Sequence, residues 1–170
     1  MNNVISKIVS AFLIFISINA YGQNASLSDQ VISDMKYMLE EEKVARDVYV
    51  FMDTTWNLRV FNNIKKSEQR HMDMMENLLN TNKIAYKLSN DNGVFYNQDL
   101  QKMYDDLIKK GSQSKQDALE VGKLIEVTDI SDLEEAIKNT EDEYIKQVYT
   151  NLLEASKNHL QAFNRQLSKY

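Results

Sequence analysis

The chain contains two histidines, and each follows a polar residue by three positions. The pairs are Glu68 with His71 and Ser156 with His159. Residues three apart lie about one turn apart on the same face of an α-helix. Carboxylate and imidazole together are ligands that suit iron, manganese or zinc. These two pairs are therefore the first candidates for chemistry.

Three further acids, Glu42, Glu126 and Asp129, stand at positions that step by three and four along apolar stretches. Such positions are buried when helices form a bundle. A buried carboxylate without compensation is costly or must take up a proton, whereas two divalent cations would neutralise four carboxylates. The sequence therefore predicts a dinuclear metal centre, with iron as the expected metal and manganese or zinc as alternatives. Its expected ligands are Glu42, Glu68, His71, Glu126, Asp129 and His159, with Tyr49 and Ser156 beside them.

Four long helices are needed to position these residues. Apolar periodicity and capping signals predict helices over residues 28–53, 58–82, 112–139 and 141–167. A long connection separates the second helix from the third, and it contains an amphipathic short helix over residues 99–110. The other connections are short, so the helices that they join are antiparallel neighbours. We therefore expect an all-α, ferritin-like four-helix bundle with a long crossover between helices two and three that carries a short helix.

The composition excludes several classes of protein. The 170 residues include no Cys and no Pro and carry a formal net charge of −5. Without Cys there is no disulfide scaffold, no Cys-based zinc or iron–sulfur site and no thiol nucleophile. An acidic balance without Lys/Arg runs argues against nucleic acid as the main partner.

The first residues have the pattern of a secretory signal peptide. Residues 1–22 combine one Lys, an apolar run over residues 8–18, and small residues at Ala20 and Gly22. We expect cleavage after Gly22 and a secreted or periplasmic domain over residues 23–170. The apolar run is short for a membrane span, so we expect no stable span after cleavage; an uncleaved N-terminal anchor is the alternative.

Four strings of the sequence together resemble a known family. They are residues 41–49, residues 61–64 followed by 67–72, residues 121–130, and residues 156–160. The chain is similar over residues 28–166 to an uncharacterised family of the ferritin-like superfamily, domain of unknown function 2202. The resemblance implies the ferritin-like fold and a metal site, but no particular reaction. The wider superfamily includes ferroxidases, peroxide-reducing rubrerythrins and oxygen-activating oxidases.

One position departs from the superfamily pattern. The fourth helix normally carries Glu-x-x-His, and here Ser156 replaces that Glu. Asp129, one turn beyond Glu126, would restore the number of carboxylates if it reaches the site. If it does not, the second metal position is weak or the site holds a single metal.

Two classes of function follow. The first is a di-iron oxidoreductase for iron oxidation, for reduction of dioxygen or peroxide, or for metal handling. The second is a non-catalytic metal carrier or interaction module with a degraded site. For the assembly, base rates among soluble oligomers favour a homodimer.

Each site residue also has a purely structural interpretation. Glu42 could belong to a solvated run of charges with Glu40 and Glu41. Asp129 could mark a helix end before a new helix. His159 could be a core histidine that Ser156 satisfies. Tyr49 is more often plain core, or a donor to a ligand carboxylate, than a redox residue.

Overall fold

The computed structural model describes residues 27–170, and this part of the chain contains five helices and no strands. The predicted signal peptide, residues 1–22, lies outside the described residues. The helices are α1 (Asp29–Trp56), α2 (Arg59–Thr81), α3 (Gln98–Gly111), α4 (Lys115–Asn139) and α5 (Glu143–Leu167). The all-α prediction is confirmed.

The helices begin where the sequence offers capping side chains. Ser28, Asn97, Ser114 and Asp142 each accept hydrogen bonds from backbone N–H groups of the first turns of α1, α3, α4 and α5. Such caps satisfy amide donors that have no partner inside the helix. The predicted boundaries are therefore met within about three residues, which is close to the usual disagreement at helix ends.

The end of α1 differs from the prediction. The predicted helix ends at residue 53, but Thr54 and Thr55 continue it, and their hydroxyls donate to the carbonyls of Val50 and Phe51 at 2.9 Å. This local bonding lets both residues stay helical. The helix ends instead at Asn57, which has φ 49° and whose N–H donates to the carbonyl of Asp53. Asn tolerates this left-handed conformation better than most residues.

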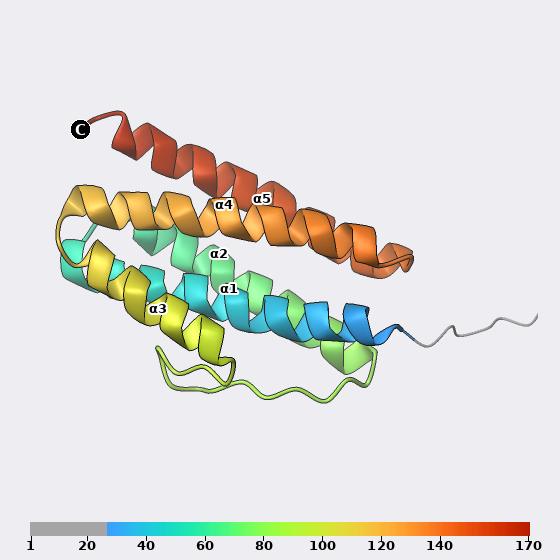
Figure 1. Cartoon of the computed structure of the whole chain (residues 1–170). Coiled ribbons are helices and arrows are strands. Elements are labelled where there is room, and N and C mark those ends of the chain that lie inside the picture. Colours follow the sequence, from blue (N-terminus) through green and yellow to red (C-terminus); the bar gives the residue numbers. More distant parts are fainter. Residues whose placement is uncertain (1–26) are drawn as a thin grey trace, which may run out of the picture.

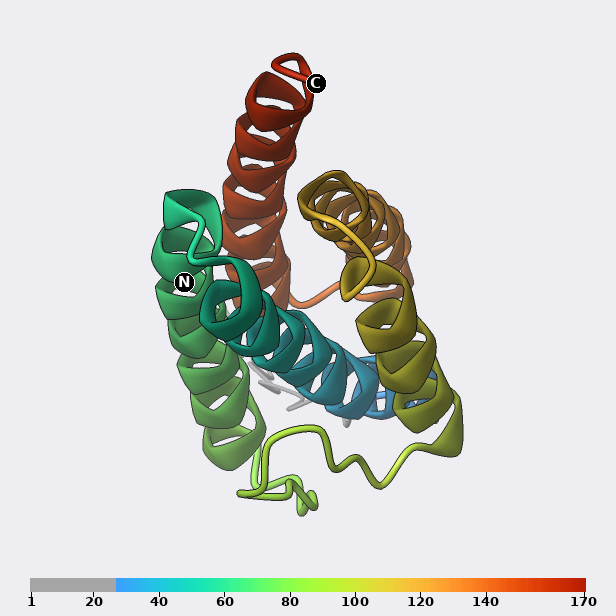
Figure 2. The same ribbon diagram turned by 90° about the vertical axis from the view of Figure 1, so that its left-hand side faces the viewer.

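Four helices form a bundle around a common core. α1 packs along α2, α4 packs along α5, and α1 also contacts α4 while α2 contacts α5. Figure 1 shows the two helix pairs side by side, and Figure 2 shows the same helices obliquely, from the end at which α1 leads into α2. α3 contacts α1 and α4 from outside the bundle, and it lies where the sequence predicted a short helix.

The core consists of two apolar clusters. One contains Met35, Met75 and Leu152, and the other contains Tyr49, Phe61 and Phe163. Buried polar and charged side chains lie between these groups of residues along each long helix. The predicted pattern of apolar ends and a polar middle is therefore what the helices show.

The connection between α2 and α3 is held against α1 by buried charges. The carboxylate of Glu40 accepts from the backbone N–H groups of Tyr96 and Asn97 at 2.7 and 3.0 Å. Lys43 donates to Asp47 at 2.5 Å and to the carbonyl of Asp91 at 2.9 Å. Residues 40–43 are all buried, so the interpretation of Glu40–Glu42 as a solvated charge run is wrong.

The sequence left open whether Asp129 marks a helix end. α4 runs from Lys115 to Asn139 without interruption, so Asp129 does not mark a helix end. Among the described residues, none of the helices combines the length and the apolar character that crossing a membrane requires.

Candidate metal centre

Five of the six predicted ligands meet in the polar middle of the bundle, and they come from four helices. Glu42 lies on α1, Glu68 and His71 on α2, Glu126 on α4 and His159 on α5. Their atoms form two groups, each of two carboxylates and one imidazole: Glu42, Glu68 and His71, and Glu68, Glu126 and His159. Within each group the ligand atoms lie within 4.8 Å of one another.

Glu68 belongs to both groups. Its Oε2 lies 2.8 Å from Nδ1 of His71, and its Oε1 lies 3.0 Å from Nδ1 of His159. The two imidazole rings stack with centroids 5.6 Å apart and an interplanar angle of 20°. One carboxylate therefore faces both histidines.

The remaining two glutamates lie at the outer side of each histidine. Oε2 of Glu42 is 3.1 Å from Nδ1 of His71, and Oε2 of Glu126 is 3.4 Å from Nδ1 of His159. Tyr49 donates to Oε1 of Glu126 at 2.7 Å and so fixes that carboxylate. The Tyr49 hydroxyl therefore holds one carboxylate oxygen of this buried cluster.

Burial sets the protonation of the carboxylates. It raises the pKa of Glu42 to about 7, although His71 acts in the opposite direction. It also raises the pKa of Glu126 to about 7, with the charge of Glu68 adding to the effect. At Glu68 burial likewise opposes ionisation, but contacts with His159 and His71 outweigh it and lower the pKa to about 2. Glu68 is therefore the carboxylate that stays ionised.

The histidines respond to these carboxylates. Burial alone would lower both pKa values. Glu42 and Glu68 instead raise the pKa of His71 to about 11, and Glu126 and Glu68 raise that of His159 to about 9. Without a metal ion, the positive charges of the protonated His71 and His159 therefore balance the charge of the carboxylates.

Several buried oxygens remain without a hydrogen-bond partner. They include Oε1 of Glu42 and Oδ1 of Asp129. Nearly all buried polar atoms in proteins are satisfied, and each exception needs an explanation. Cations that accept oxygen and nitrogen ligands would satisfy these atoms, so the residues fit a metal centre.

Asp129 and Ser156 lie beside the two groups without joining them. Asp129 is buried but belongs to neither group. Burial and the neighbouring carboxyls of Glu42 and Glu41 raise its pKa well above the usual range, and the Ser156 hydroxyl acts in the opposite direction. Ser156 donates to the carbonyl of Leu152 at 3.0 Å, within its own helix. The hydroxyl is therefore not a hydrogen-bond partner of His159 in this structure.

Sequence reasoning missed one buried acid next to the centre. Glu41 is 3% exposed, and neither of its carboxylate oxygens has a hydrogen-bond partner. Burial, followed by the carboxyls of Asp132 and Glu42, raises its pKa well above the usual range. A signal was present in the sequence, because acids recur every three residues from Glu126 to Glu135, and one of them, Asp132, is a neighbour of Glu41.

The comparisons with known proteins identify relatives without a described activity. The chain is 45% identical over 152 residues to "Uncharacterized protein MJ0754" of Methanocaldococcus jannaschii, covering 86% of this chain and 82% of that protein. It also resembles a crystal structure of hypothetical protein MJ0754 from Methanococcus jannaschii, with a TM-score of 0.83 and 44% identity over 85% of this chain and 83% of the other. Residues 32–170 match the family described as "Uncharacterized protein domain (DUF2202)". The chain therefore belongs to the DUF2202 family.

Proposed function

We propose that this protein is a ferritin-like metal protein that binds two metal ions, iron most readily, between its four long helices. The observation that carries the proposal is Glu68, whose two oxygens lie against two different histidines. A lone buried acid with one partner would be an ordinary ion pair. An ionised carboxylate shared between two imidazoles and two outer carboxylates supports a bridged pair of cations.

The helical arrangement supports the same proposal. The two groups of ligands share Glu68 on α2; the first adds His71 from α2 and Glu42 from α1, and the second adds Glu126 from α4 and His159 from α5. Ferritin-like bundles build dinuclear centres in this way, from inward-facing Glu and His on neighbouring helices. The long connection that contains α3 allows the two antiparallel helix pairs to face one another.

The chain's own residues would hold and orient the ions. Glu68 would be shared by the two ions, Glu42 and His71 would complete one position, and Glu126 and His159 would complete the other. Bound iron would supply electrons for the reduction of dioxygen or peroxide. Tyr49 fixes Glu126 through its hydroxyl, and the apolar clusters on both sides exclude water.

The proposal extends to the compartment and partners. We propose that the domain is secreted or periplasmic, because residues 1–22 have the pattern of a signal peptide. Its small-molecule partners would be iron and dioxygen or peroxide. Without a cysteine redox group of its own, the chain would depend on an external reductant for repeated turnover.

The test is the number of iron ions bound per chain. The domain is loaded with ferrous iron without oxygen, loose metal is removed, and iron is counted by elemental analysis. We expect about two ions per chain, and fewer in His71→Ala and in His159→Ala. Asn158→Ala, an exposed neighbour of His159, is the matched control and should bind as the wild type does.

The outcomes separate the proposals. Unchanged loading in both histidine variants would disprove the ligand assignment. Refusal of iron, manganese and zinc by the wild type would disprove metal binding altogether. Circular dichroism of each variant checks that lost binding does not reflect unfolding.

A second function is favoured by one specific observation. Ser156 offers no ligand to the centre, and Asp129 stands outside both groups. A site with this reduced set of carboxylates would suit a metal carrier without redox turnover. Exposure of the ferrous-loaded protein to dioxygen distinguishes the two, because only an oxidoreductase would accelerate iron oxidation over free ferrous iron.

A further inference from the structure

Acids on α4 form a row that leads away from the candidate metal centre. Glu126, Asp129, Asp132 and Glu135 follow at intervals of three residues. Three residues turn a helix by about 300°, so each step moves the side chain by about 60° around the axis. Burial changes accordingly: Glu126 and Asp129 are buried, Asp132 is half-buried and Glu135 is exposed. The row therefore runs from the centre to the protein surface.

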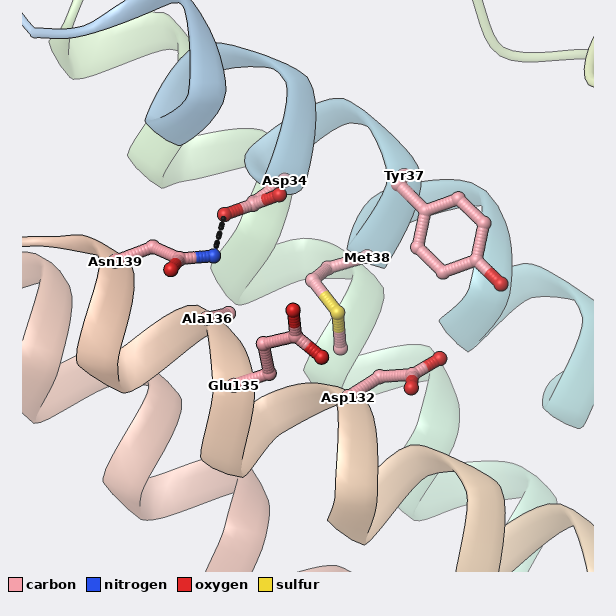
Figure 3. A pocket seen from close by; sticks show the side chains of 7 residues that line it. All are labelled: Asp34, Tyr37, Met38, Asp132, Glu135, Ala136 and Asn139. Atoms are coloured by element: carbon pink, nitrogen blue, oxygen red, sulfur yellow. Dashed lines mark hydrogen bonds between the residues drawn. The ribbon is translucent and has the colours of Figure 1, made fainter.

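The outer end of this row opens into a pocket between α1 and α4. Its volume is about 210 Å³, and it is lined by Asp34, Tyr37, Met38, Asp132, Glu135, Ala136 and Asn139. In Figure 3 the side chains of Asp132 and Glu135 extend from α4 toward α1, while Asp34 accepts a hydrogen bond from Asn139. Three acids and no basic residue line the pocket.

Glu41 links this pocket to the centre. It follows Tyr37 and Met38 by about one turn of α1, and it precedes the ligand Glu42 directly. Its carboxylate is buried among acids, with Asp132 and Glu42 as neighbours, and both oxygens are unpartnered. An acid this deeply buried and this incompletely satisfied calls for a cation or a shared proton.

We propose that this pocket and the acids behind it form the route by which divalent cations reach the metal centre. Asp132 and Glu135 would capture the ion at the surface, and Glu41 and Asp129 would pass it inward to Glu42. The inference rests on the proposed function, since a route is useful only if the centre binds metal.

Electrostatics supports this route over two other hollows on the surface. An acidic concavity with low-dielectric walls concentrates cations and accelerates their arrival. Carboxylate oxygens also replace the water ligands that an ion loses as it enters the protein. The other two hollows each contain basic side chains, Lys36 and Lys87 in one and Lys110 in the other.

The test measures the rate of loading separately from its extent. Co²⁺ is mixed with the metal-free full chain at low ionic strength, and its visible absorption is followed by stopped flow. We expect the double variant Asp132→Asn/Glu135→Gln to load about tenfold more slowly than the wild type. The final number of Co²⁺ ions per chain should be the same, because neither residue belongs to the groups around His71 and His159.

The matched control is Glu134→Gln. Glu134 is an exposed acid on the same helix, and it does not line the pocket. Its loss changes the net charge by the same amount as one of the two pocket substitutions. We expect the rate in this variant to stay within about twofold of the wild-type rate.

Each of the other outcomes would disprove a specific part of the proposal. Equal rates with full loading in the double variant would disprove the route and leave the metal centre intact. A lower final number in the double variant would make these acids part of the centre itself, which also disproves the route. A wild-type chain that binds no Co²⁺ would disprove the proposed function, and the route with it.

Discussion

Two groups of buried charges lie along the middle of α1, and they differ in how completely they are partnered. Toward the connection between α2 and α3, the carboxylate of Asp47 accepts hydrogen bonds from Lys43 at 2.5 Å, from Arg46 at 2.6 Å and from the N–H of Gly93 at 2.9 Å. Toward the bundle interior, Glu42 and Glu41 retain oxygens without a partner. Neighbouring turns of α1 thus carry one satisfied and one unsatisfied polar group.

The difference separates a structural role from a binding role. A buried ion pair whose atoms are all hydrogen-bonded stabilises the elements that it joins, and it has no free donor or acceptor for a ligand. A buried set of acids with open oxygens is stable only if protons or cations join it. We therefore expect substitutions in the first group to act on stability and those in the second to act on metal binding.

The largest effect on stability is expected for Lys43→Met. The substitution keeps an unbranched apolar chain but leaves Asp47 and the carbonyl of Asp91 without their buried donor. Removal of one partner from a buried pair costs about 3–5 kcal/mol. Urea unfolding of the metal-free chain measures the loss of unfolding free energy.

A matched control is present in α3. Lys102 and Asp106 form an ion pair with the same spacing and the same 2.5 Å distance, but both side chains are exposed. Lys102→Met should leave the unfolding free energy nearly unchanged, because water screens an exposed ion pair. The comparison fails if the two variants lose equal stability, or if Lys43→Met lowers the number of metal ions bound.

The second-largest effect is expected from the metal itself. Free ion at about one hundred times its dissociation constant should raise the unfolding free energy by about 2.7 kcal/mol. A chelator should remove this gain from the wild type, and Glu68→Gln should lack it from the start. Thermal unfolding with and without Zn²⁺ provides the measurement, and identical curves would contradict a metal centre.

The third effect is a dependence of stability on pH in the metal-free chain. Glu42 and Glu126 have pKa values raised from 4.5 to about 7, and His71 and His159 have values raised from 6.5 to about 11 and about 9. All four groups bind protons more tightly in the folded state. Their stabilisation is present at low pH and is lost as the pH rises through the folded values.

Glu68 has the opposite effect on the pH dependence of stability, and it acts at low pH. Its pKa is lowered to about 2, so its contribution is lost only as the pH falls through that value. We expect the unfolding free energy to fall between about pH 5 and about pH 9. With metal bound the trend should reverse, because the ion displaces the protons. A flat profile for the metal-free chain would contradict the protonated histidines.

The sequence predicted the helices and the polar centre because both follow from spacing along single helices. Glu42, Glu68 and His71 each fall on an apolar stripe, and a stripe becomes a core once helices pack. The partners of Glu40 and Lys43 could not be predicted in the same way. Their buried state depends on how residues 91–97 fold back over α1, which no periodicity records.

Asp129 and Ser156 show a second limit of prediction from sequence. Spacing correctly placed both on the inward side of their helices. It could not decide whether Asp129 reaches the ligand groups or whether Ser156 turns its hydroxyl toward its own helix. These outcomes depend on side-chain rotamers and on the distances between helices. Spacing along one helix fixes neither of them.

The smallest effects are expected from the two neighbours of the centre, Tyr49 and Ser156. Tyr49→Phe removes the donor to Oε1 of Glu126, so metal affinity should fall by about tenfold and stability by about 1 kcal/mol. Ser156→Ala removes a bond to the carbonyl of Leu152 and the influence of the hydroxyl on the Asp129 carboxyl, so it should cost about 0.5 kcal/mol.

Zn²⁺ titration of both variants compares the two roles directly. A hydroxyl that orients a ligand changes affinity more than stability, whereas a hydroxyl bonded within its own helix changes neither by much. Equal losses of affinity would mean that Ser156 turns toward the centre when metal binds, and would remove the distinction between the two residues. An unchanged affinity in Tyr49→Phe would mean that burial alone fixes Glu126, since its carboxylate would then hold the ion without a donor.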